Sequence, residues 1–277
     1  MPIVNKNIKK GLYICHKSTV FLMKTISILG CGWLGKLLAI SLISRGFLVK
    51  GSTTSNEKLK VLSSDNIIPF LIDISQKEIS SEFLDSDILI IAITSKKEVD
   101  FVRLISKIEK SNIKNVIFIS STSVYPVMNK IMTEEDETEI HPLVTIENLF
   151  RKNTHFETTI IRFSGLFGVE RHPANWFNNG RKIPQPNGFV NMIYLDDCIA
   201  IIENIITQNC FGETFNACSN HHPTRKDFYE FARKVKGFEL PIFEENEVLQ
   251  WKIISSEKLQ KVLGYEFKLN LFERLKI

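Results

Sequence analysis

Residues 26–35, ISILGCGWLG, constrain the fold more than any other part of the sequence. A short apolar run ends in the pattern G-x-G-x-x-G, formed by Gly30, Gly32 and Gly35, and a helical pattern follows. A strand, a glycine-rich turn and a helix in this order are typical of a site for the pyrophosphate of a dinucleotide. The first glycine permits the turn, the second lets backbone approach the phosphates, and the third lets helix and strand pack closely. We predict a dinucleotide site here; an ordinary strand-to-helix turn is the alternative.

Apolar residues recur at helical spacing after the glycines, and Gly46 stands where such a helix would end. We expect the first-turn N–H groups of this helix, those of Trp33 and Leu34 among them, to point at the phosphates. The helix dipole favours negative charge at that end. The turn and the start of the helix are therefore predicted to bind the cofactor together.

Strands and helices alternate through the first half of the chain. Apolar strands are predicted at 47–51, 67–72, 87–94, 115–120 and 158–163. Helices are predicted from about 57 and at 99–110. The run 87–94, DILIIAIT, is apolar almost throughout, as a parallel strand covered on both faces should be. This alternation predicts an α/β fold, a Rossmann-type doubly wound parallel sheet with a smaller mixed C-terminal substrate lobe.

The segment after the predicted strand at 47–51 indicates which dinucleotide is bound. An acidic residue there would bond the ribose 2′-hydroxyl of NAD and repel a 2′-phosphate. Residues 51–56, GSTTSN, contain no acid, and the hydroxyls of Thr53 and Thr54 can donate to a phosphate, with Lys50 or Lys58 supplying charge. We therefore predict NADP as the preferred cofactor and keep NAD as the alternative. The same residues would also suit a plain loop and a helix cap.

Three further residues complete the predicted cofactor site. Asp73 follows the third strand, where an acid can meet the adenine amino group, although capping a helix would suit it equally. Ala92 and Ser120 lie near the carboxyl ends of two other strands. Open α/β sheets bind their ligands at that edge, so all three residues are predicted to line the cofactor groove.

A hydroxyl-rich segment follows the strand at 115–120, and residues 119–126 read ISSTSVYP. Together with GCGWLG, DILIIAIT, IIRFSGLFG at 160–168 and NMIYLDD at 191–197, this segment resembles the NAD-dependent epimerase/dehydratase family in order and spacing. That family is the extended branch of the short-chain dehydrogenase/reductases, and the chain looks most similar to its atypical members. The resemblance runs from Lys24 to the end of the sequence, and the set of motifs is far more specific than any one of them.

The resemblance implies a catalytic serine but not the usual acid. In typical relatives a Ser or Thr four residues before a Tyr polarises the reacting oxygen, which matches Ser121 here, with Thr122 beside it as a second candidate. A Y-x-x-x-K pair on the next helix should supply the general acid and a lysine, because residues four apart share a helix face. No tyrosine occurs between Tyr125 and Tyr194, so this pair is absent.

Another group would then have to move the proton. His141, Tyr125 and Glu139 are the candidates, since geometry rather than residue type decides such a role. A histidine next to a proline also suits the start of a helix, and the acids at 134–139 also suit a solvated loop. The sequence leaves the identity of the acid open.

Three residues beyond the predicted strand at 115–120 are implied to face the substrate. Arg162 and Arg171 match family positions near the substrate cleft, where a guanidinium can make a forked contact with phosphate or carboxylate. Arg162 would equally pair with an acid near the end of the sheet. Tyr194 replaces the histidine usual in the family, and Asp197 is expected to cap the following helix. The residues that choose the substrate are expected between 170 and 190.

The chain is predicted to divide into three parts. Residues 1–22 form a poorly packed extension before the first strand. Residues 23–168 form the dinucleotide-binding domain, which also receives elements from about 189–218, and residues 169–277 form mainly the substrate-binding lobe.

Charge and composition exclude several classes of partner. The net charge is +4, but lysines and arginines are scattered among acids, so we expect no nucleic-acid partner. No apolar run is long enough to span a bilayer, so we expect no membrane partner. The five cysteines form neither a C-x-x-C motif nor a cluster with histidines, which predicts reduced thiols, a cytoplasmic protein and no metal site. A homodimer is left open.

Two functions are compatible with these patterns. The first is an NAD(P)-dependent oxidoreductase or epimerase that moves hydride between the nicotinamide and a hydroxyl or carbonyl of a sugar-nucleotide-like or other small polar substrate. The second is a redox sensor or scaffold that binds NADP(H) without turnover, which the absent Tyr and Lys favour. Loss of a general acid slows a reaction by about 10²–10⁴-fold, which a slow enzyme tolerates. We favour the enzyme.

Overall fold

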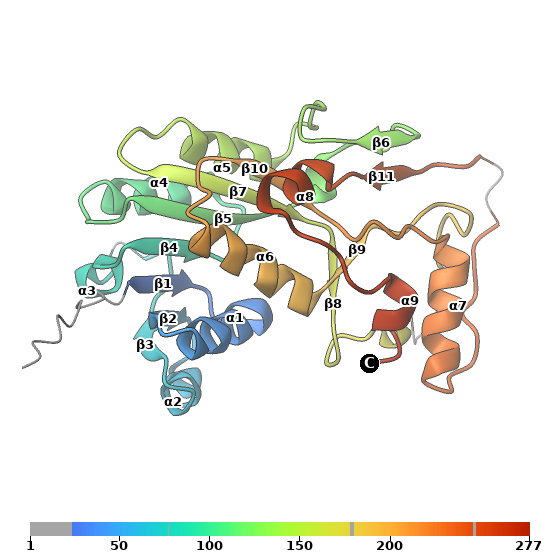
Figure 1. Cartoon of the computed structure of the whole chain (residues 1–277), viewed down its shortest axis with the longest axis horizontal. Coiled ribbons are helices and arrows are strands. Elements are labelled where there is room, and N and C mark those ends of the chain that lie inside the picture. The colour runs from blue at the N-terminus through green and yellow to red at the C-terminus, as the bar shows by residue number, and fades with distance from the viewer. Residues whose placement is uncertain (1–23, 77, 178–179, 246–247) are drawn as a thin grey trace, which may run out of the picture.

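Seven parallel strands form the central sheet of the computed structural model, which describes residues 24–76, 78–177, 180–245 and 248–277 (Figure 1). Their order is β10-β7-β5-β4-β1-β2-β3. The strands are β1 (Thr25–Leu29), β2 (Leu48–Thr53), β3 (Ile68–Leu71), β4 (Ile88–Ile91), β5 (Asn115–Ser121), β7 (Glu157–Phe163) and β10 (Thr214–Ala217). The strand order reverses between β1 and β4, which is where doubly wound sheets bind their ligands. The predicted Rossmann-type fold is confirmed, while the predicted extension, 1–22, lies outside the described residues.

Helices cover both faces of this sheet. On one face α1 (Trp33–Ser44) packs beside α6 (Leu195–Thr207), and on the other α4 (Glu98–Ile108) packs beside α5 (Pro142–Arg151). Two shorter helices, α2 (Asn56–Ser64) and α3 (Ser81–Leu84), precede β3 and β4. Because both faces are covered, all four residues of β4 are buried, as its apolar sequence predicts.

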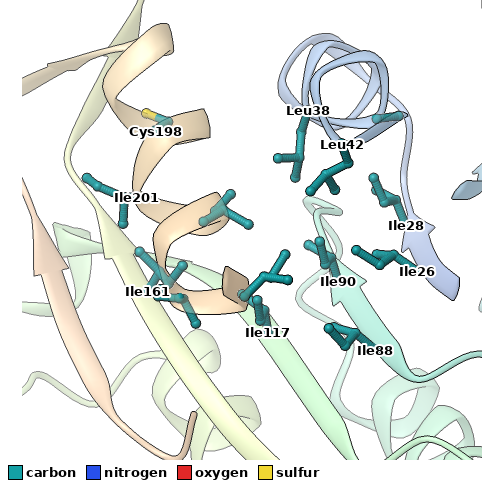
Figure 2. Packing of buried hydrophobic residues seen from close by; sticks show 14 of the residues in the cluster. Ile26, Ile28, Leu38, Leu42, Ile88, Ile90, Ile117, Ile161, Cys198 and Ile201 are labelled. Atoms are coloured by element: carbon teal, nitrogen blue, oxygen red, sulfur yellow. The ribbon is translucent and has the colours of Figure 1, made fainter. Parts of the chain in front are cut away.

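The two cores on either side of the sheet come from alternate residues of the same strands. Ile88 and Ile90 of β4 point into the core that contains Leu38 of α1 (Figure 2). Their neighbours Leu89 and Ile91 belong to the core on the α4 and α5 face. This follows from the period of two in a β-strand. Burying each such side chain contributes about 1.5–3 kcal/mol, so the sheet is a rigid base for the loops at its edge.

Some element boundaries differ from the prediction. β4 ends at Ile91 instead of residue 94. α2 begins at Asn56, one residue before the predicted start, and its N-cap is Ser55. Such ends are the least regular part of an element, since helix ends fray.

Asp197 does not cap α6, which corrects the expectation for this residue. The helix begins at Leu195 after the N-cap Tyr194, so Asp197 lies in the first turn. Its carboxylate is buried, accepts a hydrogen bond from the Tyr265 hydroxyl (2.6 Å) and pairs with Arg274 (3.1 Å). The carboxylate therefore ties the C-terminal residues to α6.

Two small parallel sheets lie beside the main sheet (Figure 1). β8 (Gly165–Phe167) pairs with β9 (Met192–Tyr194). β6 (Lys130–Met132) pairs with β11 (Lys252–Ile254), although about half of the chain separates them in sequence. The second pairing brings the C-terminal part of the chain onto the loop that follows β5.

Three helices complete the C-terminal part. They are α7 (Arg225–Val235), α8 (Glu257–Leu263) and α9 (Leu271–Arg274). The hydroxyl of Thr224 caps α7, and the C-cap of α8 is Gly264, whose φ is 62°. A third apolar core joins α7 and α9 to β9. No helix among the described residues has both the length and the apolar character needed to cross a bilayer.

Candidate functional site

The three glycines of the loop after β1 differ in what surrounds them. Gly30 has φ +99°, and a Cβ there would lie 2.6 Å from the Ala92 carbonyl oxygen. A Cβ on Gly35 would lie 2.2 Å from the Gly30 carbonyl oxygen, so only glycine lets α1 start this close to the turn. Gly32 is exposed, and a Cβ there would meet nothing within 4 Å. Internal packing thus explains Gly30 and Gly35, whereas the open space at Gly32 is a cradle that a Cβ would fill.

A groove of about 370 Å³ opens at this loop, across the carboxyl ends of β1, β2 and β4. It is lined by six of the residues predicted to bind the cofactor: Gly30, Gly32, Thr53, Thr54, Asp73 and Ala92. Trp33, Leu34 and Gly35 form the first turn of α1 directly behind Gly32. The groove opens at the first turn of α1, whose N–H groups suit a pyrophosphate, so the residues present fit a dinucleotide.

Two lysines near the groove have different surroundings. Lys50 is buried, and its ammonium donates to the carbonyl oxygens of Glu82 (2.7 Å) and Asp85 (2.6 Å). Lys58 of α2 lines the groove together with Thr53 and Thr54. Of the two lysines considered from the sequence, only Lys58 can therefore supply charge to a ligand in the groove.

Asp73, which follows β3, also lines the groove. Its carboxylate accepts the N–H of Ser75 (2.9 Å) in a tight turn. That bond, with a smaller contribution from the charge of Lys97, holds the pKa of Asp73 below its usual value. The carboxylate is exposed and charged, and it lines the groove as predicted.

A second pocket of about 530 Å³ lies beyond the end of β5. We call it the basic pocket because its lining contains Arg171, Arg225 and Lys252 and no acidic residue. Two of the predicted catalytic residues, Ser121 and Thr122, form its wall on the sheet side. Opposite them lie residues of the C-terminal part, including Tyr229 of α7.

Trp33 connects the glycine loop with the basic pocket. The Arg171 guanidinium lies 4.9 Å from the centre of the indole ring, and a Cβ on Gly168 would come within 3.0 Å of the same ring. The indole N–H is buried and has no hydrogen-bond partner among the described residues. Arg171 is thus held over the start of α1 while it lines the basic pocket.

Ser121 is positioned by the first turn after β5. This residue caps the short helix η1 (Thr122–Val124), and its Oγ accepts the N–H of Ser123 (3.1 Å). The O–H of Ser121 therefore stays available as a donor to a group in the pocket. Thr122 is buried and contributes to the same wall.

Behind this wall lies a buried polar network centred on Arg162. Its guanidinium pairs with Glu147 of α5 (2.6 Å) and donates to the Tyr125 hydroxyl (2.6 Å). The Ser120 hydroxyl donates to the same carboxylate (2.6 Å), and the Tyr125 hydroxyl donates to Asn216 Oδ1 (2.9 Å). Burial raises the pKa of Tyr125. Arg162 thus makes the acid pair that was the alternative to its predicted substrate role. Ser120 was predicted to line the cofactor groove but lies outside its lining, because its hydroxyl is bonded to Glu147, and Tyr125 also has partners inside the fold.

His141 and Tyr194 lie outside the linings of the groove and the basic pocket. His141 is the N-cap of α5, and its Nδ1 accepts the N–H of Leu143 (3.1 Å), which is the helix-start role considered for it. The ring of Tyr194 is buried 5.2 Å from that of Phe167 and 4.6 Å from the Arg274 guanidinium. The structure therefore does not bring these two residues together with Ser121.

Three residues that sequence reasoning did not select line the basic pocket: Arg225, Tyr229 and Lys252. The capping pattern at Thr224 predicts the start of α7 and so places Arg225 and Tyr229 four residues apart on one helix. It does not indicate what that helix faces. No local pattern marks Lys252.

No protein-family model matches the chain. The chain is 27% identical over 267 residues to a protein of Escherichia coli K12 described as "Protein YeeZ", covering 89% of this chain and 96% of that protein. Its fold is similar to a UDP-glucuronic acid 4-epimerase from Bacillus cereus solved in complex with NAD, with a TM-score of 0.74, 18% identity and 91% and 96% of the two chains covered. A putative NAD-dependent epimerase/dehydratase from Methylobacillus flagellatus has a TM-score of 0.72, with 20% identity and 89% and 93% covered. The structural resemblance to such epimerases extends over nearly the whole chain, as the sequence motifs predict.

Proposed function

We propose that this protein binds NADP(H), or NAD(H) as the alternative, at the glycine loop and acts as an oxidoreductase or epimerase on a substrate held in the basic pocket. The observation that carries the proposal is the open cradle at Gly32, at the start of α1 and one residue from the Trp33 that contacts Arg171. Nothing in the packing of the chain requires glycine at this position, but a pyrophosphate on the first turn of α1 would.

The preference for NADP rests on the residues that face the 2′ position. Thr53, Thr54 and Lys58 line that end of the groove, and residues 51–56 contain no carboxylate to accept a bond from a free 2′-hydroxyl. Hydroxyls and an ammonium favour a phosphate there. The similar epimerase from Bacillus cereus is described as a complex with NAD, which supports a nicotinamide dinucleotide in this fold.

A bound nicotinamide would supply or accept hydride. The chain itself contributes the donors around the reacting oxygen. Ser121 offers its O–H to that oxygen, and Arg171 offers a forked donor to an anionic part of the substrate. The buried Arg162–Glu147 pair stabilises the end of β5 behind Ser121, which keeps its hydroxyl in place.

The substrate class we propose is a sugar-nucleotide-like or other small polar molecule with a hydroxyl or carbonyl. Support comes from the three cations of the basic pocket and from similar structures described with sugar nucleotides, such as MoeE5 in complex with UDP-glucose and NAD (TM-score 0.75, 13% identity). We also propose that the chain divides into a dinucleotide-binding domain and a substrate lobe, that the protein is cytoplasmic and that it forms a homodimer.

A second candidate function is binding of NADP(H) without turnover. The observation that favours it is the lack of a Y-x-x-x-K pair together with the engagement of the Tyr125 hydroxyl by Arg162 and Asn216. In that case the basic pocket would bind a regulatory ligand instead of a substrate.

Titration of the purified full chain with NADPH and with NADH, read by fluorescence, tests the proposal. We expect saturable binding of both, tighter for NADPH. Absence of binding by either dinucleotide would contradict both candidate functions. If a cofactor binds, its stopped-flow oxidation across carbonyl and sugar-nucleotide panels separates the enzyme from the sensor.

A further inference from the structure

A reducing enzyme needs a group that gives a proton to the substrate oxygen. Of the three residues first considered for this role, Glu139 does not line the basic pocket and the other two are engaged elsewhere. The Tyr125 hydroxyl is buried between Arg162 and Asn216. The His141 ring accepts a bond from the first turn of α5. The titratable side chains that line the basic pocket are those of Arg171, Arg225, Tyr229 and Lys252.

The main chain of Lys252 is fixed by strand pairing and by a neighbouring side chain. It lies on β11, in parallel register with Lys130 of β6. The Asn191 side chain fixes it from the other side: Nδ2 donates to the Lys252 carbonyl oxygen (2.8 Å), and Oδ1 accepts the N–H of Ile254 (2.8 Å). Asn191 itself lines the basic pocket, so this clamp sets the side chain of Lys252 against the pocket wall.

The ammonium of Lys252 is directed to the loop that carries Ser121. It donates to the carbonyl oxygen of Tyr125 and, at 3.4 Å, to that of Thr122. A lysine ammonium has three N–H donors. Two are used by these carbonyl groups, so one N–H remains for another acceptor, and Lys252 lines the same pocket as Ser121.

The other three groups are poorer proton donors. A guanidinium does not lose its proton at neutral pH, which excludes Arg171 and Arg225. Tyr229 is buried in an aromatic cluster, and burial raises the pKa of its hydroxyl, with Arg225 opposing this shift. A lysine, by contrast, is readily adapted to proton transfer when it is partly desolvated.

We propose that Lys252 is the catalytic proton donor of this site, in place of the absent tyrosine. The assignment rests on the proposed function. In the direction of reduction the carbonyl carbon gains the hydride supplied by the reduced nicotinamide. The carbonyl oxygen then takes a proton from Lys252 Nζ, so one N–H bond breaks and one O–H bond forms. The neutral amine regains a proton from water in the open pocket.

The charges around Lys252 fit this role. Burial lowers the pKa of its ammonium, and the carboxylate of Glu139 opposes the shift. Arg171 and Arg225 share the pocket and add positive charge, whereas no acidic residue lines it. A proton on Lys252 is therefore easier to transfer than one on a fully solvated lysine.

The first measurement needs neither cofactor nor substrate. The full chain is acetylated briefly with acetic anhydride at a series of pH values, and the modified fraction of each lysine is read by mass spectrometry. We expect Lys252 to become reactive at a lower pH than the exposed Lys226 of α7. A reactivity curve whose midpoint lies at the same pH as that of Lys226, or at a higher pH, contradicts the proposal.

The second measurement compares Lys252→Met, Lys252→Arg and the control Lys258→Met with the wild type. Lys258 lies on α8, pairs with Glu213 (2.8 Å) and lines a different cavity. NADPH oxidation is followed with 9,10-phenanthrenequinone and with glyoxylate as probe carbonyl compounds. We expect kcat to fall by about 10²–10⁴-fold in Lys252→Met. NADPH affinity should stay unchanged, and Lys258→Met should match the wild type.

Lys252→Arg separates a chemical role from a structural one. Arginine keeps the positive charge and can still donate to the carbonyl groups of Thr122 and Tyr125, but it cannot release a proton. A low kcat in this variant supports proton donation, and a wild-type kcat overturns it. Turnover that survives in Lys252→Met contradicts the role of Lys252 as proton donor but not the proposed function. If the wild type binds NADPH but oxidises none of it, the assignment of Lys252 as proton donor is overturned and the proposed cofactor binding stands. If the wild type does not bind NADPH, the proposed function itself is contradicted.

Discussion

Replacing Gly32 by valine should remove cofactor binding without unfolding the protein. The backbone at Gly32 has φ −76° and ψ −152°, which any residue can adopt, and a Cβ there meets nothing within 4 Å. Gly32 is the N-cap of α1 and makes no side-chain bond, so we expect a loss of less than about 1 kcal/mol in the free energy of unfolding. A loss of this size lowers Tm by roughly 2–4 °C in a protein of this size class.

The effect on the cofactor should be much larger. A valine side chain would occupy the space over the first turn of α1 and hold the pyrophosphate away from its N–H groups. Losing two hydrogen bonds to a charged group, at about 1.5–3 kcal/mol each, corresponds to about 3–6 kcal/mol, or roughly 10²–10⁴-fold in Kd. Fluorescence titration with NADPH measures this change, and thermal melting of the same sample measures stability.

Gly35→Ala is the matched control because its steric conflict is internal. A Cβ there lies 2.2 Å from the Gly30 carbonyl oxygen, which is backbone and cannot rotate away. Overpacking of this kind costs about 1–3 kcal/mol or more, so this variant should melt well below Gly32→Val. A stable Gly32→Val protein that binds NADPH as tightly as the wild type would refute the assignment of the cradle.

Three other substitutions test the remaining parts of the site. Ser121→Ala should lower kcat for NADPH oxidation and leave NADPH affinity nearly unchanged, because the hydroxyl lines the basic pocket and not the groove; unaltered turnover would remove Ser121 from the mechanism. Lys58→Glu should weaken the binding of NADPH by about tenfold or more, since a charged hydrogen bond contributes about 1.5–3 kcal/mol, and should leave the binding of NADH little affected. Parallel titrations measure the two Kd values, and an equal loss of affinity for both dinucleotides would contradict a 2′-phosphate at this end of the groove. Glu147→Ala should lower the free energy of unfolding in urea by about 3–5 kcal/mol, because it leaves the buried Arg162 without its carboxylate; a loss below 1 kcal/mol would show that the pair is not needed for stability.

The dinucleotide half of the fold could be predicted because its signals are local. The glycine loop, the apolar run of β4 and the spacing of apolar residues in α1 each act within about ten residues, and together they predict a doubly wound parallel sheet. The pairing of Arg162 with an acid could be offered as an alternative for the same reason, since arginine inside a strand that is otherwise apolar needs a partner. Which acid it meets depends on how α5 packs against the sheet.

The basic pocket could be predicted only in part because half of it comes from distant segments. Ser121, Thr122 and Arg171 follow strands whose ends the sequence locates. Lys252 reaches them only through the pairing of β11 with β6, and three residues on a short strand have no signature that specifies a partner. Tyr194 was expected to face the substrate but lies outside the basic pocket. Its ring packs against Arg274 from the last described helix, and no local pattern gives the position of that helix.

The pairing of β6 with β11 also determines when the site can be completed during synthesis. A ribosome that has made β1 to β5 has produced every strand that borders the cofactor groove, and the sheet can begin to assemble around them. The strand that carries Lys252, β11, begins about 130 residues after the end of β5, and a ribosome adds roughly 5–20 residues per second. For several seconds the growing chain can therefore have a groove for the dinucleotide and no pocket for the second ligand.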